Sequence, residues 1–432
     1  MVLFQNKNYS VKSLALMKPI KLEASVVVVG GGPAGLTAAT KLREMGVGRV
    51  ILLERDAQAG GLPRYCHHPG FGMTDLYRFT TGPRYVKALI RRALRSGVDI
   101  FTETTAIAWE NDHTVVTSSP QGHQKIIAQV ILIATGCRER PRPAMLIPGT
   151  RPLGVFTTGN LQQLAQTLGT PLGTQAVIVG AEHVSFSAAH TLINNCVDVK
   201  AFITHHPWHQ TFGPILWWFD LFHRIPIYGN TLVKNLCGSS RLEGVEILNT
   251  KTGESRTVEC DTLVFTGNWI PETEWTRIGG VSLDPATNGP LVDQTLCTEY
   301  PHIFAAGNVL RGAERADVAA LEGARVAKQI INYLHGKKPA SKTRIPIHVD
   351  HPLLWVQPQT ISIESNNIPI VEYFFVQSKT FVNKATLEIR QGKDLLYTKY
   401  FQRLIPSRSK RISSSWIKSI QQNSKPIIIR VS

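Results

Sequence analysis

The stretch EASVVVVGGGPAGLTAATKLREMGVGRVILLERD, residues Glu23–Asp56, decides the fold. Its apolar, β-branched run Val26–Val29 is typical of a buried parallel strand. The run ends at a glycine-rich turn, Gly30–Gly35, and an alanine-rich amphipathic helix pattern follows to about Met45. A second apolar run, Val50–Leu53, is followed at once by an acid. This strand–turn–helix–strand order is the full context of a GxGxxG dinucleotide-binding unit.

The residue types of this turn suit a dinucleotide phosphate. Gly30 permits the tight turn, Gly32 lets the backbone approach a pyrophosphate, and Gly35 lets the helix pack against the strand. The start of the helix supplies free N–H groups and the positive end of its dipole. Glu54 lies 19 residues beyond Gly35, where a carboxylate accepts hydrogen bonds from a ribose diol. The spacing therefore predicts one intact dinucleotide site.

A second unit with the same layout, Thr174–His206, has lost that fingerprint. It begins with Gly180, but Glu182 and Ser185 stand where the second and third glycines belong. A carboxylate there repels a pyrophosphate, and a β-carbon blocks its approach. Thr204 occupies the position of the ribose-binding acid. We predict a retained scaffold with weak or absent NAD(P) binding.

Three later segments indicate which dinucleotide the first site takes. The pair Gly60–Gly61 follows Glu54, one apolar strand pattern ends in Ala-Thr-Gly at Gly136, and another ends in Gly-Asn at Asn308 before a long amphipathic helix pattern. Together these motifs resemble the FAD-binding half of two-dinucleotide-domain flavoproteins, the pyridine nucleotide-disulfide oxidoreductase-like superfamily. That family usually has Asp where this chain has Asn308, so a charge is removed while a hydrogen-bonding group remains.

The resemblance implies a set of FAD contacts. In that family the last motif meets the ribityl chain, and the start of the following helix faces the flavin N1/O2 edge, where its dipole stabilises negative charge. The residues assigned to FAD are Gly30, Gly32, Pro33, Ala34, Gly35, Glu54, Arg55, Gly61, Leu62, Ala106, Thr135, Gly136, Gly307 and Asn308.

Five further strings narrow the resemblance. They are GGLPRYCHHPGFG, ATGCRERPRPAMLIPGTRPLGVFTTGNLQQL, VGAEHVSFSA, RLEGVEIL and TGNWIPETEW. They look like the FAD subunits of amine-oxidising complexes: hydrogen cyanide synthase, opine oxidase, L-proline dehydrogenase and the sarcosine oxidase α type. Unlike many of those chains, this one has no clustered cysteines for an iron–sulfur module, and Asn268 stands where Asp is expected. The resemblance implies that electrons leave through another protein, a quinone, oxygen or NAD(P).

The loop Gln58–Gly72 collects reactive side chains after the glycine pair. Thiol exchange is unfavourable at Cys66, because the six cysteines are scattered singly. No metal site is predicted, since the adjacent His67 and His68 bring no third ligand. We predict a flavin-facing loop in which Arg64 holds a substrate carboxylate and His67 or His68 transfers a proton. The alternative, a loop shaped by prolines and glycines whose histidines bond to backbone, stays open.

The motif order predicts an α/β protein with two Rossmann-like three-layer domains, the second inserted in the first, and a small C-terminal β-domain. Alternating residues around a glycine turn predict a hairpin over Ala385–Ile405, and Lys425–Ser432 holds a last strand. The predicted division is an N-terminal extension at 1–21, FAD-binding parts at 22–150 and 284–336, an inserted NAD(P)-type domain at 151–283, a linker at 337–345 and the basic β-domain at 346–432.

The 432-residue chain carries a formal net charge of +16 at pH 7, unevenly spread. Residues 384–432 hold eleven Lys and Arg against two acids, a net +9. Such a segment is typical of a nucleic-acid or anionic-membrane patch, or else of a solvated face or a surface that docks an acidic partner. No nucleic-acid motif accompanies the charge, so we favour the second interpretation and expect no nucleic-acid partner.

No apolar run reaches the roughly 20 residues of a membrane span. The stretch ILWWFDLFHRI, Ile215–Ile225, is predicted to be core or buried interface, and His205–Gln210 a polar loop rather than a metal site. The N-terminal residues lack the apolar core and cleavage site of a signal peptide, so a cytoplasmic location is expected, with Met1 or Met17 as the start.

Three functions remain open at this point. The favoured one is an FAD-dependent oxidoreductase or dehydrogenase subunit that takes hydride from an amine, amino-acid or opine C–N bond onto flavin N5. The second is an NAD(P)H-dependent flavin reductase, which the broken second glycine motif disfavours. The third is a flavin-binding, non-catalytic docking subunit for a partner protein. The sequence leaves the small-molecule substrate, the electron acceptor and any second subunit undefined.

Overall fold

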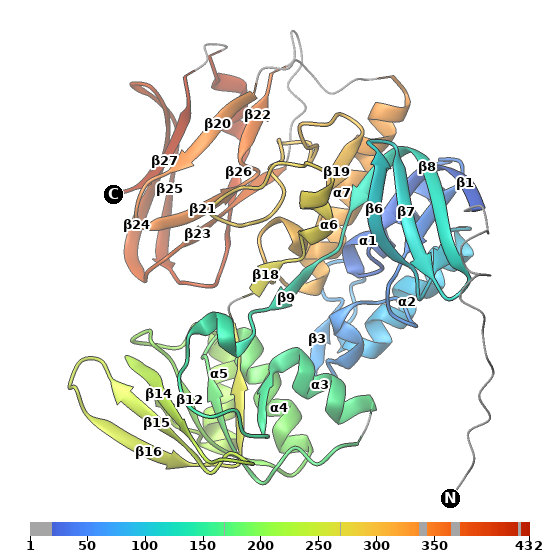
Figure 1. Ribbon diagram of the computed structural model, residues 1–432. Helices are drawn as coiled ribbons and strands as arrows, with labels where there is room; N and C mark the ends of the chain where they lie inside the picture. The colour runs from blue at the N-terminus through green and yellow to red at the C-terminus, as the bar shows by residue number, and fades with distance from the viewer. Residues whose placement is uncertain (1–19, 168, 268, 337–343, 364–371, 422–424) are drawn as a thin grey trace, which may run out of the picture.

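The computed structural model describes residues 20–167, 169–267, 269–336, 344–363, 372–421 and 425–432. Predictions about Asn268, the linker residues 337–343 and the choice between Met1 and Met17 lie outside this range. The described part has three blocks, each built on its own larger sheets (Figure 1).

The first block is built on a seven-stranded sheet of order β5–β2–β1–β8–β7–β6, with β19 paired to β8. β1, β2, β5, β8 and β19 run parallel, and β7 and β6 form an antiparallel edge. Val26–Val29 of the central strand are buried, as their apolar run predicted. The strands are β1 (Ile20–Val29), β2 (Val50–Leu53), β5 (Asp99–Phe101), β6 (Thr105–Asn111), β7 (Thr114–Ser119), β8 (Gly122–Ile133) and β19 (Ile303–Ala305).

Three helices, α1 (Pro33–Glu44), α2 (Gly82–Arg95) and α7 (Ala316–Leu334), accompany this sheet, and α1 contacts both others. A Cβ at Gly323 of α7 would lie 2.1 Å from the carbonyl oxygen of Ala34, so only glycine allows this close helix packing. The small pieces of the block are a 3-10 helix η2 (Leu62–Tyr65), the pair β3 (Pro69–Phe71) and β4 (Thr80–Thr81), and η4 (Asn308–Leu310).

The second block is built on a parallel five-stranded sheet of order β10–β17–β11–β12–β13. Helices α3, α4 and α5 pack on one face, and the antiparallel sheet β14–β15–β16 packs on the other. The third layer of this block is therefore a β-sheet. The elements are β10 (Val155–Thr157), α3 (Thr158–Thr167), β11 (Gln175–Val179), α4 (His183–Asn194), β12 (Asp198–Ile203), α5 (Gly213–His223), β13 (Ile227–Tyr228), β14 (Thr231–Cys237), β15 (Gly244–Asn249), β16 (Ser255–Glu259) and β17 (Thr262–Phe265).

Two antiparallel segments join these blocks, β9 (Cys137–Glu139) and β18 (Trp269–Pro271), visible between them in Figure 1. Beyond β9 lies a short 3-10 helix, η3 (Arg142–Met145), and beyond β18 the helix α6 (Glu274–Ile278). Trp275 of α6 stacks on Trp109 at 4.1 Å and belongs to the core of the first sheet. The chain has therefore returned to the first block by Trp275, earlier than the sequence division placed it.

The C-terminal block consists of a five-stranded sheet, β22–β20–β27–β24–β25, and a three-stranded sheet, β21–β23–β26, around one apolar core. The predicted hairpin and last strand are confirmed as β24, β25 and β27. The elements are β20 (Arg344–Val349), β21 (Leu353–Gln357), β22 (Thr360–Ser362), β23 (Tyr373–Ser378), β24 (Val382–Gln391), β25 (Asp394–Leu404), β26 (Lys410–Ser413), η5 (Ser415–Ser419) and β27 (Ile427–Val431).

Ile215–Ile225 was predicted to be core or buried interface, and most of its side chains are not part of the core of this chain. This stretch forms helix α5, in which Phe219 is buried while Trp217 is 66% exposed and Phe222 62% exposed. The sheet needs only one face of this helix, although apolar residues occur on every side. None of the helices in the described residues has the length and apolar character needed to cross a membrane.

Candidate functional site

The first glycine turn closes tightly against the end of β8. Gly30 has φ +114°, and a Cβ there would lie 2.2 Å from the carbonyl oxygen of Ala134. A Cβ at Gly35 would lie 2.0 Å from the carbonyl oxygen of Gly30. Helix α1 starts at Pro33 without a side-chain cap, so its first N–H groups remain available to a ligand.

The motifs that the sequence analysis assigned to FAD come together around this helix start. The Gly31 N–H donates to Oε2 of Glu54 over 3.1 Å, and the Gly60 N–H donates to the Gly31 carbonyl over 2.7 Å. A Cβ at Gly307 would lie 2.7 Å from the Cβ of Ala34. Three segments far apart in sequence, around Glu54–Gly60, Ala134 and Gly307, therefore contact the glycine turn and the start of α1.

Open space lies between these segments. A Cβ added at Gly32 or at Gly136 would meet no heavy atom within 4 Å, while one at Gly61 would lie 3.2 Å from the Cα of Gly32. Backbone that is open at Gly32 and Gly136, next to an uncapped helix start, is what an extended pyrophosphate needs. The residues present therefore fit FAD.

Glu54 is placed to hold a ribose. Its carboxylate is buried and accepts the N–H groups of Gly31 at 3.1 Å and Asp56 at 3.0 Å. Burial raises its pKa above the ordinary value, although these backbone donors lower it in part. A carboxylate has about four acceptor positions, so two are left for the hydroxyls of a ribose.

The remaining predicted FAD contacts differ in exposure and position. Arg55 is exposed and Leu62 is 41% exposed. Ala106 lies on β6, two residues after Thr104, whose N–H pairs with the Glu54 carbonyl at 2.9 Å. Their contact with FAD stays a prediction.

Two further predicted contacts lie on the connecting segments. The Thr135 hydroxyl donates to the Glu272 carbonyl over 2.7 Å, beside Gly136. The Asn308 side chain accepts the Glu314 N–H at 3.3 Å and hydrogen-bonds Cys137, whose thiol has its pKa raised to about 12 by burial. Asn308 is thus held in place by neighbours on both sides.

The Gly307 turn is fixed from behind by a buried ion pair. Oε2 of Glu322 accepts the Gly307 N–H at 2.9 Å, and its Oε1 accepts Arg311 at 2.8 Å. Arg311 also donates to Gln357 over 3.0 Å and lies over the Phe375 ring at 4.2 Å. The C-terminal block therefore packs directly behind a segment of the predicted FAD site, which the sequence did not indicate.

An acidic side chain of the helix itself lies at the start of α7. Asp317 lies buried in its first turn, hydrogen-bonded to Thr74, and its Oδ1 accepts the Val318 N–H at 2.9 Å. The resemblance implied that this helix start faces the flavin N1/O2 edge. A carboxylate there offsets part of the positive helix end.

The predicted catalytic residues do not share one environment. Arg64 forms an ion pair with Asp56 and donates Nε to the Gly61 carbonyl over 3.2 Å, so it is engaged within its own loop. His67 is exposed. His68 is half-buried and faces α4, with its ring 6.1 Å from that of His190.

Cys66 in the same loop is a free thiol. Its sulfur lies 3.4 Å from Oε1 of Gln162 on α3, and burial raises its pKa to about 12. A thiol that stays protonated at neutral pH is a poor nucleophile. The environment of Cys66 thus agrees with the expectation that it does not exchange disulfides.

The second glycine turn is closed by its own side chains. A Cβ at Gly180 would lie 1.9 Å from Oγ1 of Thr266, 2.7 Å from Oε2 of Glu182 and 2.9 Å from Oγ of Ser185. The Glu182 carboxylate folds inward at the start of α4 and interacts with the hydroxyls of Thr266 and Ser185, and burial raises its pKa. A buried acid thus stands at the second fingerprint position, where glycine normally lets the backbone approach a pyrophosphate.

Sequence reasoning missed two acidic features between the blocks. Glu139 accepts the N–H groups of Thr158 at 2.9 Å and Gly159 at 2.7 Å at the start of α3. Glu272 and Glu274 flank Arg138, and burial together with Glu274 raises the pKa of Glu272. Only the position of Glu139, three residues after Gly136 of the Ala-Thr-Gly motif, could have pointed to it.

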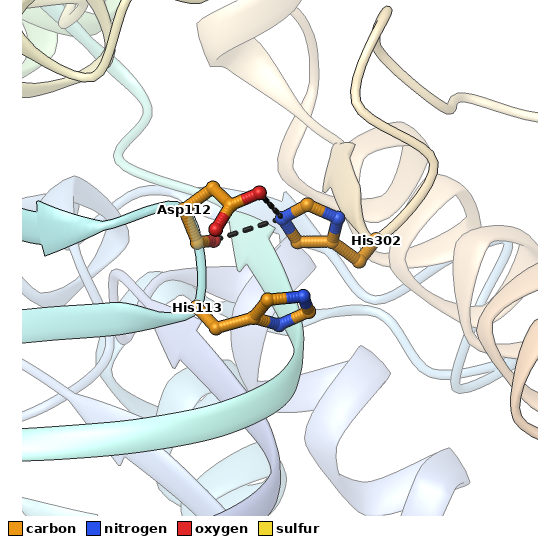
Figure 2. Close-up of side chains that lie close together, drawn as sticks. All are labelled: Asp112, His113 and His302. Atoms are coloured by element: carbon orange, nitrogen blue, oxygen red, sulfur yellow. Dashed lines mark hydrogen bonds and ion pairs between the residues drawn. The ribbon is translucent and has the colours of Figure 1, made fainter.

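Within the described residues, Asp112, His113 and His302 form a group with the ligand spacing of a metal site (Figure 2). Nε2 of His302 donates to the Asp112 carbonyl over 2.8 Å, and Nδ1 of His113 donates to the Ala128 carbonyl over 2.9 Å. The two rings stack at 4.0 Å with planes only 23° apart. One ion cannot lie about 2 Å from a nitrogen of each ring in both ring planes, so we interpret the group as a structural tie between the β6–β7 turn and β19.

Comparisons with known proteins agree with this picture. A family model described as pyridine nucleotide-disulphide oxidoreductase matches residues 24–323. Ferredoxin–NADP reductase of Ignicoccus hospitalis is 24% identical over 306 residues, which cover 69% of this chain and 93% of that protein. One of the subunits of the opine oxidase of Rhizobium meliloti is 25% identical over 331 residues, which cover 71% of this chain and 70% of that protein.

Among solved structures, the thioredoxin reductase of T. acidophilum superposes with a TM-score of 0.62 at 20% sequence identity, covering 72% of this chain and 99% of that chain. At this identity the likeness concerns the fold alone. The expected resemblance to amine-oxidising proteins thus holds in part, because the opine oxidase and the ferredoxin reductase match at similar identity.

Proposed function

Because the chain belongs to the pyridine nucleotide-disulphide oxidoreductase family, a family of flavin-dependent enzymes, we propose that it is an FAD-dependent dehydrogenase for a C–N bond. The substrate class is an amine, an amino acid or an opine. The observation that carries the proposal is the buried carboxylate of Glu182 in the second glycine turn. Because that turn has no room for NAD(P)H, the reducing substrate must be another molecule.

The first glycine turn, Glu54 and the Gly307 turn would hold the cofactor. The start of α1 binds the pyrophosphate, Glu54 orients the ribose, and the Arg311–Glu322 pair keeps the Gly307 turn rigid. When bound, FAD accepts the hydride that leaves the substrate carbon.

His68 is the residue we favour for proton transfer. Its Nδ1 lies 2.8 Å from the Pro69 carbonyl, which can only accept, so Nδ1 carries the hydrogen and Nε2 keeps its lone pair. Burial lowers the pKa of His68, so the ring stays neutral and can take a proton from a substrate ammonium group. Arg64 would first have to leave Asp56 before holding a substrate carboxylate.

His68→Gln should slow substrate reduction of the flavin about 100-fold while leaving bound FAD unchanged, because a general base contributes about that much. Stopped-flow absorbance of the flavin checks the rate, and His123→Gln, an exposed histidine on β8, is the matched control. A His68→Gln enzyme with the wild-type rate would remove His68 from the mechanism.

The experiment that tests the function is anaerobic mixing of the flavin-loaded chain with a panel of amino acids, opines and amines, and separately with NADH and NADPH. We expect at least one C–N substrate to bleach the visible flavin absorbance and both nicotinamide nucleotides to leave it unchanged for many turnover times. Bleaching by NADH or NADPH alone would contradict the proposal.

A second candidate function has a specific observation in its favour. Ferredoxin–NADP reductase of Ignicoccus hospitalis matches this chain over 93% of its own length. A reductase that takes electrons from NAD(P)H would follow if Glu182 moved out of the second glycine turn on binding. The same panel separates the two functions.

A further inference from the structure

Helix α5 exposes an aromatic face that the fold leaves uncovered. The exposed fractions are 66% for Trp217, 40% for Trp218, 52% for Leu221 and 62% for Phe222. With 100° between successive residues, these four side chains lie within one arc of about 140°, whose edge adjoins the buried Phe219. We refer to these four residues as the aromatic face.

A further exposed tryptophan precedes the helix in sequence. Trp208, five residues before the start of α5, is 62% exposed. A helix with apolar residues all round is ordinarily buried in a core or in a lipid phase, and a soluble surface seldom carries so many large apolar side chains together. Burying these side chains in a lipid phase or against a partner would remove the free-energy cost of exposing them to water.

A group of cations of the C-terminal block adjoins the start of α5. The Arg408 guanidinium lies over the ring of Phe212, the N-cap of α5, at 4.1 Å. Arg403 lies over Phe381 at 5.1 Å, and that ring packs against His206 at 5.8 Å. The C-terminal block, near β24 and β25, is therefore in direct contact with the segment that leads into α5.

These cations crowd one another without acidic partners. Burial and the neighbouring Arg408 and Lys399 lower the pKa of Lys410, and burial with Arg403 lowers the pKa of Arg408. Among the ion pairs of the described residues, none joins a carboxylate to Lys399, Arg403, Arg408 or Lys410. Glu314, on an adjoining segment, is hydrogen-bonded to Ser409. We refer to these four cations as the basic cluster.

We propose that the aromatic face and the basic cluster together form a surface that binds the head-group region of an anionic lipid bilayer. Exposed Trp, Phe and Leu on one short helix match shallow insertion, because aromatic rings favour the membrane–water interface. The Lys and Arg side chains of the basic cluster, which form no ion pair with a carboxylate among the described residues, are attracted to anionic lipids. The aromatic face favours a lipid bilayer as the partner. The basic cluster favours an anionic bilayer, because an uncharged one would offer these cations no partners.

A lipid-binding surface differs from the solvated face or acidic-partner dock that the sequence favoured for the basic C-terminal segment. Lipid binding goes beyond the proposed oxidoreductase function and does not depend on it, because it is measured without any substrate.

The test uses the full, flavin-loaded chain and two kinds of vesicle, phosphatidylcholine alone and phosphatidylcholine mixed with phosphatidylglycerol. We expect co-sedimentation with the mixed vesicles, weakened by salt, and little with phosphatidylcholine alone. The double variant Trp217→Ser/Phe222→Ser should lower the partition coefficient about tenfold or more, as should Arg403→Glu/Lys410→Glu.

Matched controls separate this surface from general stickiness. Phe79→Ser removes a 71% exposed ring of the first block, and Arg91→Glu reverses an exposed charge on α2; both should bind as the wild type does. Unchanged flavin content shows that each variant is folded.

Three outcomes would overturn the proposal. The first is no binding to the anionic vesicles. The second is that the control substitutions weaken binding as much as the α5 substitutions do. The third is that single-stranded RNA displaces the protein from the vesicles and that the α5 variants bind this RNA as tightly as the wild type.

Discussion

The two glycine turns share a topology but differ in what their second and third fingerprint positions hold. Gly32 opens onto free space at the uncapped start of α1, whereas Glu182 fills the same place at the start of α4 with a buried carboxylate. Gly35 allows α1 to touch its own turn, whereas Ser185 hydrogen-bonds Thr266 at 2.6 Å. The same strand–turn–helix scaffold is thus present in both blocks. The side chains at the second and third fingerprint positions account for the difference between the open first turn and the filled second turn.

The largest expected effect comes from giving the first turn the residue of the second. Gly32→Glu should fold, because a Cβ there meets nothing within 4 Å, but it should abolish FAD binding. A carboxylate about 4 Å from a phosphate charge costs about 4 kcal/mol at an effective dielectric of 20, or roughly a thousandfold in affinity. The flavin-to-protein absorbance ratio measures it.

Gly32→Ala is the control for that variant, since it adds the β-carbon without the charge and should retain most of the FAD. Full flavin content in Gly32→Glu would show that no phosphate lies against the first turn.

A smaller effect is expected from opening the second turn. The double variant Glu182→Gly/Ser185→Gly removes the buried acid and the extra hydroxyl. NADPH affinity should rise about tenfold, because an unfavourable buried polar contact costs roughly 1–3 kcal/mol. Fluorescence titration with NADPH checks this. Glu259→Ala, an exposed acid on β16 of the same block, controls for net charge. No gain would mean that more than these two side chains has been lost, for example the ribose acid that Thr204 replaces.

The smallest expected effect concerns pH. Burial raises the folded-state pKa of Glu182, so this residue favours the folded protein at pH below its unfolded value, about 4.3, and that contribution is lost as pH rises through the folded pKa. Glu182→Gln, which cannot ionise, should therefore raise the free energy of unfolding at pH 8 by about 1 kcal/mol and change it little near pH 4. Urea unfolding at both pH values measures the difference. An equal change at both pH values would place the effect in packing and not in ionisation.

Local pattern was enough to predict the first block's strand, turn and helix, because each position is set by neighbours within a few residues. Gly30 and Gly35 are required by contacts inside the motif, and the acid Glu54 follows at a fixed spacing. The sequence likewise showed that the second and third glycines of the second fingerprint are replaced by Glu182 and Ser185. That its carboxylate turns inward depends on Thr266, 84 residues further on, and no local pattern contains that contact.

The failures have the same origin. The ion pair of Arg64 with Asp56 was not expected from the sequence, and the role of Arg64 stays a prediction. The apolar stretch of α5 looked like core, but the second sheet needs only the side that carries Phe219. Glu322 and Arg311 gave no signal at all, because their pairing requires the C-terminal block with Gln357 in place.

The measurement that tests the central claim most directly is isothermal titration of the flavin-free chain with FAD, NADH and NADPH in turn. We expect one FAD bound per chain and no heat of binding from either nicotinamide nucleotide, before or after FAD is added. Saturable binding of NADH or NADPH to the FAD-loaded chain would contradict the claim, because the second glycine turn would then be open in solution.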